Sequence, residues 1–207
     1  MTTTIQAPLG IVKGNLSLPS SKSISNRLLI IRALCKGPVE IRGLSEAYDT
    51  RLLAELLRSG LDVLNCEHGG TTFRFLTAYL ATMPEIKTVT GSDRMKERPI
   101  KELVSVLQKM GAKIEYLEKE GFPPLKIIGT ELEGGKIKID GEISSQFITS
   151  ILLIAPTLKN GIDLEIVGEL VSKPYIEMTL NLMSEFGIHW ELTNNIITIK
   201  NQKYRAK

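Results

Sequence analysis

The sequence is poor in the residues that mark several large classes of protein. Among 207 residues there are two cysteines, two histidines and one tryptophan, and 5% of residues are aromatic. Cys35 and Cys66 cannot supply the disulfide framework of a small secreted domain. The 26 Lys and Arg against 23 Asp and Glu give a net charge of +3. That charge, with so few stacking rings, is too small to indicate a nucleic-acid partner.

Long hydrophobic runs are missing as well. Residues 1–15 contain no apolar segment of signal-peptide length, and no run reaches the roughly 18 apolar residues of a membrane span. We therefore expect a cytoplasmic protein without a membrane partner. The content of 43% hydrophobic and 24% charged residues is typical of a globular chain with a sizeable core. A small positive balance is compatible with an anionic small molecule.

Motifs of the common nucleotide, metal and hydrolytic sites do not occur. The stretch "GGTT" (69–72) lacks the Gly-Lys-Ser/Thr ending of a Walker loop, and there is no GxGxxG. Cys66, His68 and the isolated His189 have no second Cys/His pair at zinc spacing, so no metal is expected. No serine combines a nucleophile-elbow context with His and Asp partners, which argues against a hydrolase.

The sequence does contain a recurring unit. Three helical stretches end in glycine and lead into a short strand, at 51–64, 101–117 and 176–192. When they are aligned on these glycines, apolar residues fall in register. The aligned sets are Gly60, Gly111 and Gly187; Leu53, Val104 and Leu180; Leu56, Leu107 and Met183; and Val63, Ile114 and Trp190. Spacings of three and four predict amphipathic helices, and the glycine suits a left-handed C-cap.

Other segments extend this unit in both directions. A second strand follows the last two copies, at 123–129 and 195–200, and is missing from the first copy. A strand precedes each glycine-ended helix, and a more apolar helix precedes that strand. The strands are at 38–43, 85–91 and 162–168, and the apolar helices are at 23–37, 70–83 and 144–158. Helix and strand alternate in any α/β protein, but this register favours an α/β (α+β) fold of three repeated helix–strand–helix–strand(–strand) units.

The three apolar helices all open with small or hydroxyl residues. These are Ser20, Ser21 and Ser23; Gly70, Thr71 and Thr72; and Ser144 and Ser145. One interpretation is that they only cap their helices. The other is that threefold packing places three helix starts on one face, where free N–H groups and the helix dipoles hold an anion. Six cations at helix starts or in the preceding loops favour the second interpretation: Lys22, Arg27, Arg74, Arg94, Arg98 and Lys173.

Five stretches resemble one known family. "LPSSKSISNRLLIIRAL" (18–34) resembles the N-terminal substrate-binding motif of 5-enolpyruvylshikimate-3-phosphate synthases, also called 3-phosphoshikimate 1-carboxyvinyltransferases. Four more match in the same order: "GGTTFRFLTA" (69–78), "DRMKERPI" (93–100), "SSQFITSILLIAP" (144–156) and "SKPYIEMTL" (172–180). The resemblance implies a transferase of the shikimate pathway of aromatic amino-acid biosynthesis. Such an enzyme moves the enolpyruvyl group of phosphoenolpyruvate to the 5-hydroxyl of shikimate 3-phosphate and releases phosphate, without a metal or organic cofactor.

The resemblance also implies site residues. Those expected to bind shikimate 3-phosphate are Ser23, Arg27, Ser144, Ser145, Gln146, Ser172 and Tyr175. Those expected to bind phosphoenolpyruvate are Lys22, Gly70, Arg74 and Arg94, the glycine because a side chain there would intrude on the ligand. Fixed guanidinium groups suit planar carboxylates and phosphates. The sequence departs from the family at His68, where the family has asparagine, and at Phe75, where it usually has proline.

The family folds as two similar globes around a shared site, each globe being three units about a pseudo-threefold axis. This chain resembles the first globe. We expect residues 1–18 to be the strand segment that joins the second globe and 19–207 to be the substrate-binding globe. The catalytic acid and base belong to the second globe, so the 207 residues alone are expected to bind substrate without turnover. The face that a second globe would cover is a candidate for self-association.

Two other functions remain open. One is the related enolpyruvyl transferase that acts on UDP-N-acetylglucosamine. That enzyme has asparagine after the motif lysine and a cysteine in the loop at 93–100, whereas this chain has Ser23 and no cysteine there. The other is a non-catalytic anion-binding or interaction module on the same fold. Such a module would bind shikimate 3-phosphate without releasing phosphate from phosphoenolpyruvate.

Overall fold

The computed structural model describes residues 3–4, 10–11, 13–170 and 172–205. The helices in this part of the chain are α1 (Lys22–Leu34), α2 (Tyr48–Leu56), α3 (Gly70–Ala81), α4 (Asp93–Lys96), α5 (Lys101–Lys109), α6 (Ser145–Ile154), the short 3-10 helix η1 (Ala155–Thr157) and α7 (Lys173–Glu185). The strands are β1 (Val63–Asn65), β2 (Ile86–Thr90), β3 (Lys113–Tyr116), β4 (Leu125–Ile128), β5 (Gly135–Asp140), β6 (Ile162–Val167), β7 (Glu191–Thr193) and β8 (Ile196–Ile199).

The strands form two four-stranded sheets with the same internal order. One runs β1-β2-β4-β3 and the other β5-β6-β8-β7. In each sheet the first pair of strands is parallel and the other pairs are antiparallel. In the second sheet Ile162 of β6 lies between Gly135 of β5 and Ile199 of β8. Each sheet therefore belongs to one complete unit that reads strand, apolar helix, strand, glycine-ended helix and hairpin.

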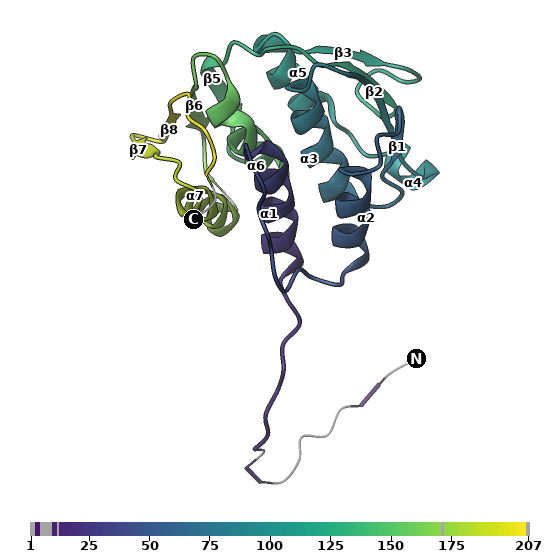
Figure 1. Ribbon diagram of the computed structural model, residues 1–207, viewed down its shortest axis with the longest axis vertical. Coiled ribbons are helices and arrows are strands. Elements are labelled where there is room, and N and C mark those ends of the chain that lie inside the picture. Colours follow the sequence, from purple (N-terminus) through teal and green to yellow (C-terminus); the bar gives the residue numbers. More distant parts are fainter. Residues whose placement is uncertain (1–2, 5–9, 12, 171, 206–207) are drawn as a thin grey trace.

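The helices fill the space between the sheets in a cyclic arrangement. The apolar helices α1, α3 and α6 contact one another. Each glycine-ended helix packs against two of them: α2 against α1 and α3, α5 against α3 and α6, and α7 against α6 and α1. Figure 1 shows the two sheets on the outside of this helical layer. The three helix pairs are thus related by a pseudo-threefold axis, as predicted.

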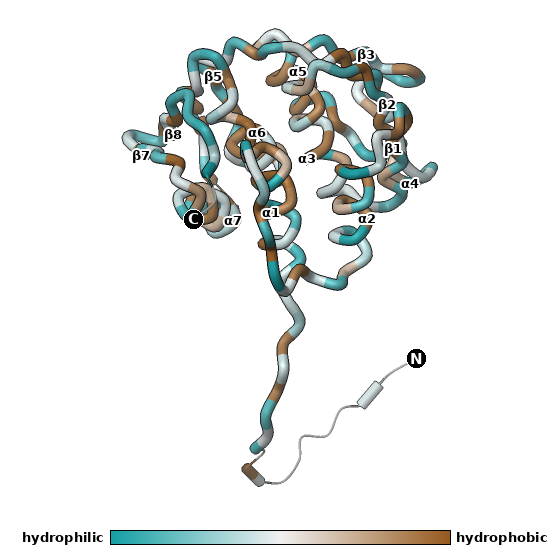
Figure 2. The backbone as a smooth tube through the Cα atoms, in the orientation of Figure 1, coloured by the Kyte–Doolittle hydropathy of each residue, from teal (hydrophilic) through white to brown (hydrophobic). Residues whose placement is uncertain are grey.

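The core confirms the helical part of the register read from the sequence. The aligned positions Leu53, Val104 and Leu180 are at most 2% exposed, whereas the aligned strand residue Val63 is 56% exposed. The aligned glycines have left-handed φ angles of 64°, 101° and 80°; Gly111 and Gly187 directly follow the C-caps of α5 and α7, and Gly60 lies three residues after that of α2. Hydrophobic residues gather along α1, α3 and α6 (Figure 2). None of the helices in the described ranges has both the length and the apolar content needed to cross a membrane.

The first unit departs from the prediction. Residues 38–43 form no strand, and β1 pairs with β2 as the leading strand of the second unit. A strand needs a hydrogen-bonded neighbour, and the described residues place no third sheet beside 38–43. The leading strand β5 was not predicted at all.

The predicted segment 1–18 is described only in part, because residues 1–2, 5–9 and 12 lie outside the described residues. Residues 13–20 are exposed, form neither helix nor strand, and extend from the start of α1 away from the helical layer (Figure 1). Leu16 and Leu18 are 89% and 83% exposed. The pairing of this segment with a second globe stays a prediction.

Candidate functional site

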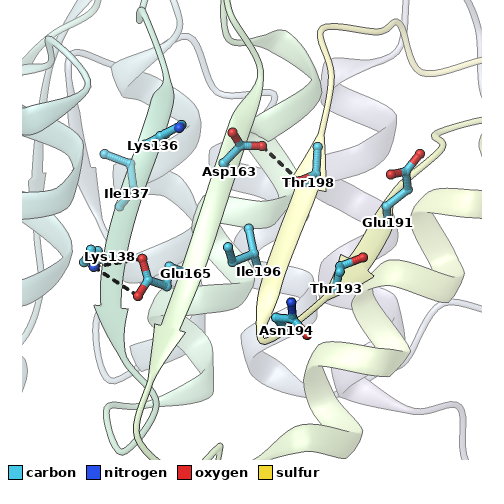
Figure 3. Close-up of a pocket in the computed structure, with 10 residues that line it drawn as sticks. All are labelled: Lys136, Ile137, Lys138, Asp163, Glu165, Glu191, Thr193, Asn194, Ile196 and Thr198. Atoms are coloured by element: carbon cyan, nitrogen blue, oxygen red, sulfur yellow. Dashed lines mark hydrogen bonds and ion pairs between the residues drawn. The ribbon is translucent and has the colours of Figure 1, made fainter.

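Two hollows are candidates for the functional site, and they differ in the charges of the residues that line them. The larger, of about 490 Å³, lies on the outward face of the β5-β6-β8-β7 sheet (Figure 3). Its lining holds two lysines and three acids, namely Lys136, Lys138, Asp163, Glu165 and Glu191. Lys138 Nζ lies 3.0 Å from Glu165 Oε1, and Thr198 Oγ1 donates to Asp163 Oδ1 at 2.9 Å. It contains none of the predicted site residues. Because its carboxylates outnumber its cations, this hollow offers little attraction to an anion.

The second pocket, of about 350 Å³, lies where α1, α3, α6 and α7 begin. The predicted site residues that line it are Lys22, Ser23, Arg27, Ser144, Ser145, Gln146 and Tyr175. Asn26, Thr71 and Phe75 complete the lining. No acidic side chain is among these lining residues. The three helix starts therefore converge as predicted, on a pocket that holds two cations.

The hydroxyl residues at the helix starts divide between capping and lining. Ser21 Oγ accepts from the Ile24 N–H, and Ser144 Oγ accepts from the Gln146 N–H, each at 3.4 Å. The start of α3 has no side-chain cap among the described residues, since its N-cap is Gly69. The hydroxyls of Ser23 and Ser145, which cap no helix in the described part of the chain, line the pocket. Capping thus accounts for some of these residues and leaves others free for a ligand.

Arg27 is the buried cation of the pocket, at 4% exposure. Its Nε donates to Thr179 Oγ1 at 2.7 Å, its Nη1 to the Ser23 carbonyl at 2.8 Å, and its Nη2 to Thr149 Oγ1 and the Tyr175 carbonyl at 3.2 and 3.3 Å. All four acceptors are neutral. Burial lowers the pKa of Arg27 from 12.5 to about 10, so the guanidinium stays charged at neutral pH. It is a buried cation without a carboxylate partner in the described residues.

A second pair of cations lies at the start of α3. Arg74 Nη1 donates to the Gly70 carbonyl at 2.9 Å, while its buried Nε has no partner among the described residues. Burial, and then the charge of Arg98, lower the pKa of Arg74 to about 10. A Cβ on Gly70 would collide with the Arg98 guanidinium and lie 2.7 Å from Arg74 Nη1. Two guanidinium groups therefore lie close to the Gly70 backbone, and the predicted need for glycine to leave room for the ligand stays a prediction.

The remaining predicted residues lie outside the pocket or are already paired within the chain. Arg94, on α4, is exposed and pairs with Glu97 at 2.9 Å. Ser172 precedes α7 and does not line the pocket. Lys22 lines the pocket, but its Nζ pairs with Asp49 Oδ2 at 3.0 Å.

Three further residues of interest are His68, Lys173 and Asn26. His68 Nδ1 lies 2.7 Å from Ser92 Oγ, so the imidazole is anchored beside the loop before α4. Lys173 pairs with Glu177 at 3.5 Å. Sequence analysis gave no role to Asn26, although it follows Lys22 by four residues and so shares its face of the helix. This spacing of four residues is the sequence feature from which a role for Asn26 could have been predicted.

Comparison with known proteins identifies the family of the chain. The family model for EPSP synthase (3-phosphoshikimate 1-carboxyvinyltransferase) matches residues 7–61 and 59–207. A 3-phosphoshikimate 1-carboxyvinyltransferase of Bacteroides fragilis is 51% identical over 196 residues, which are 94% of this chain and 48% of that protein. The corresponding protein of Haemophilus influenzae is 42% identical over 214 residues, covering 89% of this chain and 50% of that protein.

A solved structure shows the same fold. EPSP synthase from Acinetobacter baumannii superimposes with a TM-score of 0.80 at 22% sequence identity, covering 93% of this chain and 48% of that one. The chain spans about half the length of the curated relatives that it matches. With a family match over nearly all of its residues, the chain belongs to the EPSP synthase family.

Proposed function

We propose that this chain forms the shikimate 3-phosphate-binding half of a 3-phosphoshikimate 1-carboxyvinyltransferase. The observation that carries the proposal is the pocket of about 350 Å³, where the cations of Lys22 and Arg27 meet the hydroxyls of Ser23, Ser144 and Ser145. No acid is among the lining residues; Lys22 pairs with Asp49 outside the lining, whereas Arg27 has no carboxylate partner in the described residues. A hydroxylated phosphate ester complements both features, because cations and hydroxyl donors form charge-assisted hydrogen bonds with phosphate oxygens.

Arg27 would attract the ligand mainly by its positive charge, because most of its N–H donors already bond within the chain. A guanidinium has five N–H donors, and four contacts inside the chain leave one of them, on Nη1, for a ligand. The serine hydroxyls and Tyr175 would then hold the phosphate and the hydroxyl groups, with Gln146 under the ring. Ser172 stays a predicted contributor that does not line this pocket.

Phosphoenolpyruvate would lie against the start of α3. Arg98 lies beside Gly70 and Arg74, whereas Arg94 is occupied by Glu97. Arg94 stays the predicted contributor, because an exposed ion pair exchanges readily for a substrate, and we add Arg98 as a second candidate. Lys22 would exchange its carboxylate partner for the substrate. Fixed cations in these places would offset charge on the carboxylate and on the departing phosphate, which is electrostatic preorganisation.

In the family the catalytic acid and base come from the second globe, and this chain matches the first. We expect the 207 residues by themselves to bind shikimate 3-phosphate without releasing phosphate from phosphoenolpyruvate. Turnover at enzyme-like rates by the pure chain would contradict this expectation. Self-association through the face that a second globe would cover stays a prediction, which sedimentation of the chain would check.

The test is a calorimetric titration of shikimate 3-phosphate into the chain. We expect saturable binding that Arg27→Ala weakens by roughly 1.5–3 kcal/mol, the value of a charge-assisted hydrogen bond. Lys138→Gln is the matched control, because it also removes one cation but lies on the sheet face, bound to Glu165. Failure to saturate, or equal affinity for shikimate without its phosphate, would refute the proposal.

A phosphate-release assay separates the enzyme from the binding module. A chain extended through the second half should release phosphate from phosphoenolpyruvate when shikimate 3-phosphate is present. Binding by the extended chain with no phosphate release would favour the non-catalytic module.

A further inference from the structure

We infer that Asn26 is a ligand-binding residue of the pocket, whose side-chain Nδ2 donates a hydrogen bond to an anionic oxygen of the ligand. The inference rests on the proposed function of the same pocket. Asn26 is 0% exposed, yet it lines the pocket together with Lys22 and Arg27 of the same helix. A neutral amide between two cations can add a donor without adding charge.

Asn26 carries an unsatisfied hydrogen-bond donor. Thr50 Oγ1, on α2, donates to Asn26 Oδ1 at 2.8 Å, which places Nδ2 at the free end of the amide. Asn26 Nδ2 is buried and has no hydrogen-bond partner among the described residues. Buried donors are paired in almost all folded proteins, so an unpaired one in a pocket lining indicates a partner that enters from the pocket.

An unsatisfied acceptor lies in the same pocket. Gln146 Oε1, on α6, is also buried and has no partner in the described residues. The residues that line the pocket therefore include a spare donor on α1 and a spare acceptor on α6, together with the charge of Arg27. A ligand that satisfies both needs an acceptor oxygen and a hydroxyl donor, and the charge of Arg27 favours an anion; a phosphorylated polyol meets all three requirements.

The competing explanation is that Asn26 only braces α1 against α2. The bond to Thr50 accounts for Oδ1 but leaves Nδ2 unexplained. Two variants separate these roles. Asn26→Asp keeps an acceptor for Thr50, replaces the donor by a second acceptor and adds a negative charge that itself repels an anion. Thr50→Val removes the brace and keeps the donor.

The experiment is a titration of each variant with shikimate 3-phosphate, paired with thermal unfolding. We expect Asn26→Asp to weaken binding roughly 10- to 100-fold, as for loss of a bond to a charged group, with a melting temperature near that of the unaltered chain. We expect Thr50→Val to lower the melting temperature while binding changes less than about threefold. Binding by Asn26→Asp within about threefold of the unaltered chain, or an equal loss in both variants, would overturn the inference.

A second measurement covers the case in which Asn26→Asp does not fold. In the 15N-labelled unaltered chain, the side-chain amide resonances of Asn26 should shift when shikimate 3-phosphate is added. If they stay in place while those of Gln146 shift, the inference fails and the proposed function stands. If the unaltered chain shows no saturable binding at all, the proposed function fails, and the inference fails with it.

Discussion

Arg27→Met should weaken ligand binding at least tenfold and leave the fold almost as stable as before. The side chain is 4% exposed, and methionine can fill much of its volume without a charge. The lowering of the pKa of Arg27 from 12.5 to about 10 corresponds to roughly 3 kcal/mol against the charged form in the folded chain. The substitution removes this penalty.

The same substitution loses four hydrogen bonds, each worth about 1 kcal/mol net. Few acceptors would be left without a partner. Thr179 Oγ1 still donates to the Tyr175 carbonyl at 2.7 Å and lies 3.2 Å from Thr149 Oγ1. The removed penalty on the buried charge and the four lost hydrogen bonds nearly cancel. We therefore expect the free energy of unfolding to change by less than about 2 kcal/mol. Binding of shikimate 3-phosphate should fall at least tenfold.

The assay is urea unfolding together with a calorimetric titration of the same preparations. Leu29→Ala is the internal standard, because Leu29 lies on the same helix at 0% exposure and its truncation should cost roughly 2–5 kcal/mol. Arg27→Met should be the less destabilising of the two. The reasoning is refuted if Arg27→Met is as destabilising as Leu29→Ala, or if it still binds the ligand with unchanged affinity.

Three further outcomes are expected. Gly70→Ala should weaken phosphoenolpyruvate binding about tenfold in the presence of shikimate 3-phosphate, because its Cβ would displace the Arg98 guanidinium. Titration of the double variant with Arg98→Gln should show no added loss, and additive losses would contradict this. Burial raises the pKa of the Cys66 thiol, so this thiol ionises at a lower pH in the unfolded chain than in the folded one. The free energy of unfolding should therefore fall above about pH 8.5, by roughly 2 kcal/mol at pH 10. Urea unfolding from pH 7 to 10 should show a shallower fall for Cys66→Ala, and identical slopes would exclude this cause. Gly129→Ala should cost roughly 2–4 kcal/mol in the same assay, because its Cβ would collide with a backbone carbonyl, and a neutral result would contradict the close approach.

The helices of this fold could be predicted because their signals are local. Periodicity identified the apolar and the glycine-ended helices, and each aligned glycine adopts the left-handed conformation that a C-cap requires. The strand β5 was also predictable in principle, since Ile137 and Ile139 are buried while Lys136 and Lys138 are exposed. This alternation went unassigned because β5 lies outside the segments that align on the three glycines.

A strand at 38–43 could not be decided from its own residues. Its composition resembles that of β2 and β6, but those strands lie between two hydrogen-bonded neighbours, and the described residues give 38–43 none. Neighbours also had to be known at the site. Arg94 and Arg98 belong to one motif, and only the tertiary structure shows that Arg98 lies beside Gly70 while Arg94 pairs with Glu97; the role of Arg94 stays a prediction.

The repeat itself explains why cations are buried at these helix starts. Arg27 in α1 and Arg74 in α3 each donate from Nη1 to the carbonyl four residues earlier, that of Ser23 or of Gly70. The equivalent position of α6 holds Thr149, which accepts from Arg27 instead. Of these three positions, two hold a buried cation and the third supplies a neutral acceptor to Arg27. Both arginines have a lowered pKa and neither has a carboxylate partner in the described residues. An anion bound beside either arginine would relieve the penalty on that buried charge, so the charge that is costly in the unliganded fold is also what favours a phosphorylated ligand.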